Sequence, residues 1–256
     1  MAALQLDGPG ISFDGRVALV TGAGRGIGAA IARELHGGGA RVAVTDMDLE
    51  YAQAVAKELD PSGETAIAFK LDVREKKDFE DALATVTQRW SKLDIVVNNA
   101  GYAKRTPTED ITPEEFDEIV SINMRSVFLS CQVFSKHMVS RGYGRIVNVT
   151  SLASHNGGTV AAAHYSAAKG GATTLTRYFA RHLAGTGVTV NAVSPGPVLS
   201  AKERLAHLLD DISKQVPVGR FAEPSEIAAA VALVASDRGG YIVGATIDVN
   251  GGLHMR

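Results

Sequence analysis

The chain has 256 residues, of which 45% are hydrophobic and 21% charged, and its formal net charge is −2. This mix predicts a soluble globular protein with a sizeable core, and the near-neutral balance excludes the basic surface that nucleic acid or an anionic membrane attracts. Its one cysteine cannot form an internal disulfide, and the sequence shows neither a signal-peptide pattern nor an apolar run of about 20 residues, so we expect a cytoplasmic protein.

Short apolar runs alternate with stretches of helical spacing along the chain. The predicted strands are residues 16–21, 41–45, 66–70, 94–98, 145–150, 188–193 and 245–249. The predicted helices are residues 26–36, 49–59, 76–90, 113–139, 163–184, 202–214 and 224–235. This alternation predicts an α/β fold, a Rossmann-like doubly wound parallel sheet of seven strands. No linker divides it, so residues 1–256 are expected to form one domain, with 1–11 as a flexible N-terminal extension.

A glycine-rich turn directly follows the first predicted strand and opens the first helix. It reads Thr21-Gly22-Ala23-Gly24-Arg25-Gly26-Ile27-Gly28. Glycines let the backbone approach a pyrophosphate, and the helix that begins there points N–H groups and its positive dipole end at the phosphates. A tight turn without a ligand would show the same glycines, but this place in a βαβ unit favours a dinucleotide. The candidate contacts are Gly22, Arg25, Gly26, Ile27 and Gly28.

Asp46 ends the second predicted strand, 18 residues after Gly28. A carboxylate there accepts hydrogen bonds from both adenosine ribose hydroxyls and repels a 2′-phosphate, which predicts NAD(H) rather than NADP(H). Two alternatives stay open: Asp46 is an ordinary helix cap, or Arg25 pairs with a 2′-phosphate. We expect the carboxylate to dominate because it lies against the ribose itself.

Polar residues also follow the third and fourth predicted strands. Asp72 and Val73 come after the third and are placed to meet the adenine edge, and Asn99, Ala100 and Gly101 come after the fourth. The carboxyl ends of parallel strands share one edge, which is where open α/β sheets bind ligands. Each of these residues could be a turn residue, but their order along one edge favours a cofactor site.

Tyr165 and Lys169 lie one turn apart on one face of a predicted helix. A tyrosine has an ordinary pKa of about 10, and a neighbouring ammonium favours its phenolate, which brings it towards neutral pH. Tyr165 is therefore the candidate general acid/base. Ser151 follows the fifth strand and is placed to donate a hydrogen bond to the substrate oxygen. No metal site is predicted.

Together these motifs resemble the classical short-chain dehydrogenase/reductase (SDR) family over about residues 12–252. The resemblance implies the strand order 3-2-1-4-5-6-7 and a homotetramer. It implies a catalytic tetrad of Asn123, Ser151, Tyr165 and Lys169, in which Asn123 holds a water that connects Lys169 to solvent. It also implies that Tyr165 and Lys169 bind the nicotinamide ribose, that Val198 meets the carboxamide by its backbone, and that Pro195, Gly196 and Ser200 are further cofactor contacts.

The sequence departs from the family pattern in two places. Ser151 and Tyr165 are 14 residues apart, one more than the family commonly has. Bacterial ketoacyl-carrier-protein reductases, which the chain also resembles, carry arginines that grip the acidic carrier where this chain has Leu129 and Thr186. The second departure weakens an acyl-carrier function without excluding it.

The substrate wall is expected around Ser151, Ala153, His155, Asn156 and Tyr165, and its polar groups suit a sugar or polyol unless they merely face water. The segment 201–214 is either a lid or a packed surface helix. We therefore predict an NAD(H)-dependent oxidoreductase that interconverts a small polar secondary alcohol and a ketone. The alternatives are an NADPH-dependent 3-oxoacyl-thioester reductase, a nucleotide-binding sensor and a scaffold.

Overall fold

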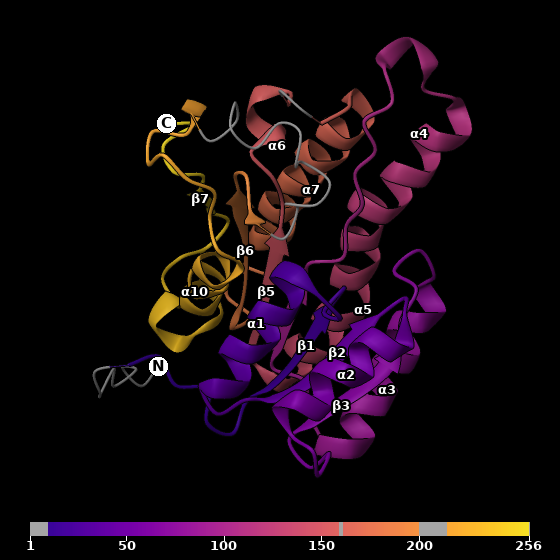
Figure 1. The fold of residues 1–256 in the computed structure, drawn as a ribbon. Coiled ribbons are helices and arrows are strands. Elements are labelled where there is room, and N and C mark those ends of the chain that lie inside the picture. The colour runs from indigo at the N-terminus through magenta and orange to yellow at the C-terminus, as the bar shows by residue number, and fades with distance from the viewer. Residues whose placement is uncertain (1–9, 159–160, 200–213, 256) are drawn as a thin grey trace.

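A seven-stranded sheet forms the centre of the molecule, in the computed structural model that describes residues 10–158, 161–199 and 214–255 (Figure 1). Its strands are β1 (Val17–Thr21), β2 (Arg41–Asp46), β3 (Ala66–Lys70), β4 (Ile95–Asn98), β5 (Gly144–Val149), β6 (Val188–Pro195) and β7 (Thr246–Val249). All six neighbouring pairs are parallel, in the order β3-β2-β1-β4-β5-β6-β7. The predicted fold class and strand order are confirmed.

Helices cover both faces of this sheet. They are α1 (Gly26–Gly37), α2 (Leu49–Leu59), α3 (Lys76–Trp90), α4 (Pro113–Val120), α5 (Ser126–Arg141), α6 (Ala153–Asn156), α7 (Ala163–His182) and α10 (Pro224–Ala235). Short 3-10 turns lie at Thr108–Asp110 and Asp237–Gly239. The predicted helix at 202–214 falls, apart from its last residue, outside the described residues.

The core divides into two layers because successive residues of a strand point to opposite faces. In β1, Ala18 and Val20 pack with α1, α2 and α10, whereas Val17 and Leu19 pack with α3, α5 and α7. All five residues of β1 are buried, as the continuous apolar run predicts for a strand covered on both sides. Among the described residues, no helix combines the length and the apolar composition that crossing a membrane requires.

The predicted helix at 113–139 is interrupted. A π-helical turn at Ser121–Arg125 separates α4 from α5. Within it Asn123 is fully buried, and its side chain donates to the Ile119 carbonyl at 3.0 Å. Such single wide turns often occur at functional sites, and this one sets the direction of a predicted catalytic residue.

The strand order reverses between β1 and β4, so the crossovers on either side of this point leave in opposite directions. In doubly wound sheets, ligands bind in the crevice that opens there beyond the carboxyl ends of the strands. In Figure 1, α4 projects beyond this edge of the sheet, on the side of α7. The fold therefore places the residues that follow β1, β4 and β5 around one opening.

Candidate active site

A cleft of about 1000 Å³ lies at the carboxyl edge of the sheet. The predicted cofactor residues that line it are Gly22, Arg25, Gly26, Ile27, Gly28, Asp46, Asp72, Val73, Asn99, Ala100, Gly101, Pro195, Gly196 and Val198. Ser151, Tyr165 and Lys169 line it as well. Ser200 lies outside the described residues. Further residues of the lining, which no motif in the sequence pointed to, are Met47, Arg74, Ile122, Val149, Thr150 and Pro197.

The glycine turn is held against the end of β4. Gly22 has a φ of +60°, and a Cβ on it would stand 2.8 Å from the Ala100 Cα. The Asn99 side chain donates to the carbonyls of Thr21 at 3.0 Å and Gly22 at 2.9 Å. A Cβ on Gly28 would stand 2.2 Å from the Gly22 oxygen, a backbone atom that cannot move away alone. These glycines close the turn, and Asn99 acts first as its brace.

The start of α1 suits a phosphate group. Arg25 occupies the N-cap without a side-chain hydrogen bond to the helix, and the first turn carries no acidic residue. Gly26, Ile27 and Gly28 nevertheless line the cleft, so this helix end presents backbone N–H donors and the positive end of its dipole there. The residues present therefore fit the pyrophosphate of a dinucleotide.

Asp46 lies at the far end of the same cleft. Its two carboxylate oxygens accept hydrogen bonds from the Gly24 N–H at 3.0 Å and the Asp48 N–H at 3.1 Å. A carboxylate has about four acceptor positions, so both oxygens keep capacity for ribose hydroxyls. The exposed Arg25 lies nearby, with its guanidinium carbon 5.2 Å from the centre of the Tyr51 ring.

Asp72 is bound by a neighbour that the sequence analysis missed. The Arg74 guanidinium donates to its carboxylate through Nε at 2.9 Å and Nη2 at 2.5 Å. This hydrogen-bonded pair holds the pKa of Asp72 below its ordinary value. A basic residue two positions after the aspartate was the available signal. A contact of Asp72 with adenine remains a prediction.

Lys169 lies buried at the centre of the cleft, 4% exposed. Its Nζ donates to the Val149 carbonyl at 2.9 Å and lies 5.8 Å from the centre of the Tyr165 ring. Burial lowers the pKa of Lys169 to about 8, so it is mostly protonated at neutral pH. Ser151 stands at the end of β5, where its Oγ accepts a hydrogen bond from the Ala153 N–H at 3.2 Å. The structure thus brings a phenol, an ammonium and a hydroxyl to one opening.

Asn123 lies behind this group and does not line the cleft. Its amide donates to the Tyr102 carbonyl at 2.8 Å, and its Oδ1 accepts from the Tyr102 N–H at 3.3 Å. Gly101 lies between it and the lysine: a Cβ at this position would stand 3.0 Å from the Asn123 Oδ1 and 3.2 Å from the Lys169 Nζ. Asn123 therefore fixes the loop after β4, and the water relay stays a prediction.

Comparison with known proteins identifies the family. A family model described as enoyl-(acyl carrier protein) reductase matches residues 22–254. A solved structure from Brucella melitensis, described as a short-chain dehydrogenase/reductase, glucose/ribitol dehydrogenase, has a TM-score of 0.88 at 33% identity and covers 96% of this chain and 99% of its own. The chain belongs to the short-chain dehydrogenase/reductase family. It is accordingly an oxidoreductase of a family that binds a nicotinamide cofactor.

Two curated relatives differ in their named activities. A D-threitol dehydrogenase of Mycolicibacterium smegmatis is 39% identical over 253 residues, which is 95% of each chain. The 3-oxoacyl-[acyl-carrier-protein] reductase FabG of Escherichia coli is 38% identical over 251 residues, 96% of this chain and all of that one. Similarity at this level leaves the substrate to be argued from the site.

The predicted substrate residues beyond Ser151 and Tyr165 lie apart from the described cleft lining. Ala153 is buried, and Asn156 is exposed and accepts a hydrogen bond from the Gly158 N–H at 2.9 Å. The side chain of His155 is 8% exposed, with its Nε2 3.4 Å from the Asp248 Oδ1. Its ring stacks on His254 at 5.6 Å, so His155 does not simply face water. Their contact with substrate stays a prediction.

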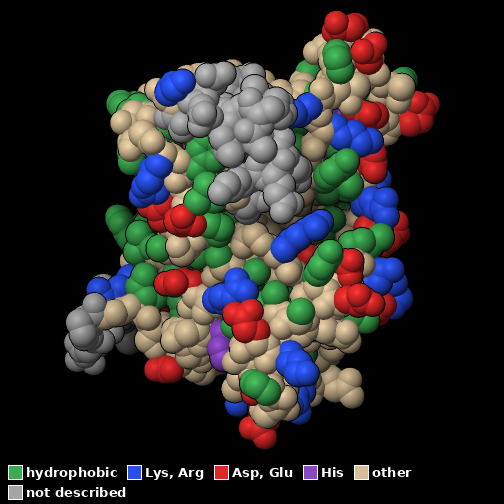
Figure 2. Space-filling view, in the orientation of Figure 1, with side chains coloured by type: hydrophobic (Ala, Val, Ile, Leu, Met, Phe, Trp, Pro, Cys, Tyr) green, Lys and Arg blue, Asp and Glu red, His purple; other side chains and the backbone are tan. Residues whose placement is uncertain are grey.

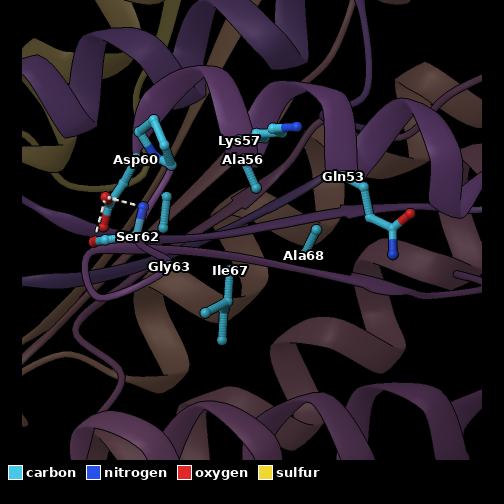
Figure 3. A pocket seen from close by; sticks show the side chains of 10 residues that line it. Gln53, Ala56, Lys57, Asp60, Ser62, Gly63, Ile67 and Ala68 are labelled. Carbon is cyan, nitrogen blue, oxygen red and sulfur yellow. Dashed lines mark hydrogen bonds between the residues drawn. The ribbon is translucent and has the colours of Figure 1, made fainter.

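A second, smaller hollow of about 350 Å³ lies between α2 and β3 (Figure 3). Its polar groups are used locally: the Asp60 carboxylate accepts hydrogen bonds from the Ser62 hydroxyl at 2.6 Å and from the Thr65 N–H at 2.7 Å. These bonds shape the turn before β3. The chemistry of the site therefore belongs to the larger cleft.

Proposed function

We propose that the chain is an NAD(H)-dependent dehydrogenase that interconverts a small polar secondary alcohol and its ketone. The observation that carries this proposal is the buried Lys169, which lies beside Tyr165 in a cleft whose other end is the glycine turn of α1. The uncapped helix start would hold the pyrophosphate, and Asp46 the adenosine ribose. The bound nicotinamide would supply the hydride acceptor during oxidation and the hydride donor during reduction.

The protein side chains supply the proton chemistry. During alcohol oxidation, Ser151 donates a hydrogen bond to the substrate oxygen while Tyr165, as phenolate, takes the hydroxyl proton. The cationic Lys169 stabilises that phenolate through the low-dielectric surroundings that its burial creates. In ketone reduction the same phenol returns the proton to the substrate oxygen. We further expect Asn123 to hold the water that exchanges this proton with solvent.

We expect the protein to prefer NAD(H) over NADP(H) because the carboxylate of Asp46 lies in the cleft. A 2′-phosphate there would meet a like charge, and Asp46 is fixed by two backbone N–H groups, so it cannot swing away without losing both. Arg25 is the opposing observation, since it lines the same cleft and its exposed guanidinium lies 5.2 Å from the centre of the Tyr51 ring. A fixed carboxylate outweighs an exposed arginine because solvent weakens the pairing of an exposed cation.

A polyol or sugar is the proposed substrate, in line with the D-threitol dehydrogenase and glucose/ribitol dehydrogenase among the similar proteins. The 3-oxoacyl-carrier reductase is the second candidate because its relative is nearly as similar. Acidic side chains gather on the projecting region before and within α4 (Figure 2), namely Glu109, Asp110, Glu114 and Asp117. These charges, with the neutral Leu129 and Thr186, disfavour an acidic carrier protein.

Lys104, in the loop after β4, does not provide a binding site for an anionic substrate. Its Nζ lies 3.1 Å from the Glu118 Oε2 and 3.6 Å from the Glu115 Oε2, so two carboxylates already neutralise it. The hydrogen bond and charge of Glu118, and to a smaller extent the charge of Glu115, raise the pKa of Lys104 above its ordinary value. This pairing supports an uncharged substrate over an anionic one.

The test is a screen for NADH formation with polyols, sugars, hydroxy acids and steroids, run beside NADPH oxidation with a 3-oxoacyl thioester. We expect turnover of a polyol or sugar with NAD⁺ and its loss in Tyr165→Phe. Turnover restricted to the thioester with NADPH would establish the second candidate instead. Binding of NADH without turnover of any substrate would favour a sensor, and the absence of binding in calorimetry a scaffold.

We further expect assembly as a homotetramer, by analogy with the family, and a cytoplasmic location, which suits a chain with a single cysteine. Phe128 on α5 and Tyr178 on α7 are 39% and 59% exposed and suit burial between subunits. Light scattering after size-exclusion chromatography tests the assembly, and a monomer at micromolar concentration would contradict it.

A further inference from the structure

The residue directly before Tyr165 is a fully buried histidine. His164 is 0% exposed, and its Nε2 lies 3.0 Å from the Oε1 of Glu115 on α4. The helix α7 begins one residue earlier, and its N-cap, Ala162, has no side chain that can hold the first turn. The end of α7 that carries Tyr165 is therefore held from outside, by a side chain 49 residues away in the sequence.

The ionisation of Glu115 decides which of the two side chains donates the hydrogen bond. Hydrogen bonds from Thr106 and His164, together with the charge of Lys104, hold the pKa of Glu115 below its ordinary value. An ionised carboxylate only accepts, so the His164 Nε2 must carry the hydrogen and donate it. The Nδ1 atom is buried and has no hydrogen-bond partner within the described residues, so the contact with Glu115 is made by Nε2 alone. The positive end of the α7 dipole also favours a carboxylate over a second cation at this place.

Glu115 also binds the loop after β4, the first residues of which line the cleft. Lys104 and Thr106, which contact its carboxylate, belong to the loop after β4. Tyr102 in the same loop lines the cleft, and its backbone is held by Asn123. The loop is thus attached at one point to the π-helical turn and at another, through Glu115, to the first turn of α7.

We propose that His164 and Glu115 form a positioning pair that sets the Tyr165 hydroxyl relative to the loop wall of the substrate cleft. The proposal rests on the proposed function, in which Tyr165 transfers the proton. Neither side chain touches substrate; each acts by holding the element that does. Breaking the pair lets the first turn of α7 move against the wall, which lowers kcat while leaving the dinucleotide end of the cleft intact.

The experiment compares His164→Leu, His164→Gln and Glu115→Ala with the wild type. Leucine removes the donor, whereas glutamine places an N–H close to the position of Nε2. We expect His164→Leu and Glu115→Ala to lower kcat by about 10- to 100-fold, because a misplacement of the order of 1 Å has this cost. His164→Gln should restore kcat to within about threefold of the wild type, and the double variant His164→Leu/Glu115→Ala should fall no further than the larger single effect.

Two readouts separate positioning from general instability. The Kd for NADH, measured by calorimetry, should change far less than kcat in all variants, because most of the cofactor contacts, among them the glycine turn and Asp46, lie on elements other than α7. His137→Leu is the matched control: this α5 histidine binds the Leu93 N–H at 3.3 Å, away from the cleft lining, so its loss should lower Tm without lowering kcat. Comparable losses of kcat in His137→Leu and His164→Leu would overturn the proposal.

A third readout does not depend on turnover. The ¹³Cζ resonance of Tyr165, assigned through Tyr165→Phe, should move or broaden in His164→Leu and Glu115→Ala and return in His164→Gln. An unchanged resonance in both disrupting variants would overturn the positioning pair. If the wild type turns over no substrate with NAD⁺, the proposed function fails, yet this resonance still tests the pair. Should His164→Leu not fold, Glu115→Ala, at a partly exposed position, and His164→Gln, which keeps a donor near Nε2, carry the comparison.

Discussion

The burial of Lys169 has a measurable consequence for stability. Its Nζ is enclosed by protein, with the Val149 carbonyl at 2.9 Å, and burial lowers its pKa from 10.5 to about 8. The protein therefore folds more readily when this lysine is neutral than when it is charged. Replacement by methionine, which keeps the length of the side chain and removes the titrating group, isolates this effect.

The sign and size follow from proton linkage. Between pH 8 and 10.5 the unfolded chain holds the Lys169 proton and the folded chain has released it. The free energy of unfolding therefore rises with pH across this window and loses that gain as pH falls through about 8. At about 1.4 kcal/mol per pH unit, the gain between pH 7 and 9.5 is on the order of 2 kcal/mol, and over the whole window about 3 kcal/mol.

Urea unfolding of the wild type and Lys169→Met at several pH values between 7 and 9.5 measures the difference. The free energy of unfolding of the wild type, minus that of Lys169→Met, should rise by about 2 kcal/mol across this range. Taking the difference removes the other groups that titrate in the same interval. Lys169→Met should also lose about 100-fold or more in kcat, since the proton chemistry loses its cation.

A difference between the two proteins that stays constant with pH would refute the reasoning. It would mean that Lys169 titrates at the same pKa in the folded and unfolded chains, and hence that the enclosing side chains do not exclude water from the ammonium. The case that Lys169 acts on Tyr165 through a low-dielectric environment would then fail as well.

Three further predictions concern the cofactor end and the loop after β4. Asp46→Ala should raise the ratio of kcat/KM for NADP(H) over NAD(H) by roughly tenfold or more, because a like charge beside the 2′-phosphate is removed. Asp46→Asn removes the same charge but keeps an acceptor for one backbone N–H, and an unchanged ratio in steady-state kinetics would contradict this use of Asp46. Gly28→Ala should lower Tm and weaken NADH binding in calorimetry, since its Cβ would stand 2.2 Å from a backbone oxygen, and unaltered binding would show that the turn can relax. Gly101→Ala should lower kcat by about 10-fold or more, because its Cβ would crowd the Asn123 amide and the Lys169 ammonium at 3.0 and 3.2 Å. Full activity would show that the space between those two groups is not used.

The sequence predicted the sheet well because each strand carries its own signal. The run at residues 17–20 is apolar and ends in Thr21, and all five of these residues are buried. The interruption at Ser121–Arg125 was not predicted, because apolar spacing continues across it and a π-helical turn has no compositional mark. The cofactor end of the cleft could also be predicted, since Gly22 follows β1, Gly28 lies in the first turn of α1 and Asp46 ends β2, and strand ends converge by topology.

Contacts between segments that are distant in the sequence could not be predicted in this way. His164 was passed over although it precedes Tyr165, because nothing in its surroundings indicates that Glu115 lies 3.0 Å away. Likewise His155 reads as a loop residue until β7 brings Asp248 to within 3.4 Å of it. Such pairs arise from how helices and loops pack on the sheet, and hydrophobic periodicity specifies only which face is buried.

The buried lysine and the glycine beside it are best understood together. A side chain at position 101 would crowd the Asn123 Oδ1 at 3.0 Å and the Lys169 Nζ at 3.2 Å. This chain has a glycine there and keeps a cation in a place that disfavours its charge by about 3 kcal/mol. A structural lysine would gain nothing from either choice, because it would be more stable at the surface. Both features are explained if the ammonium must be charged, enclosed and still reachable by one small polar partner, which is what proton transfer through Tyr165 requires.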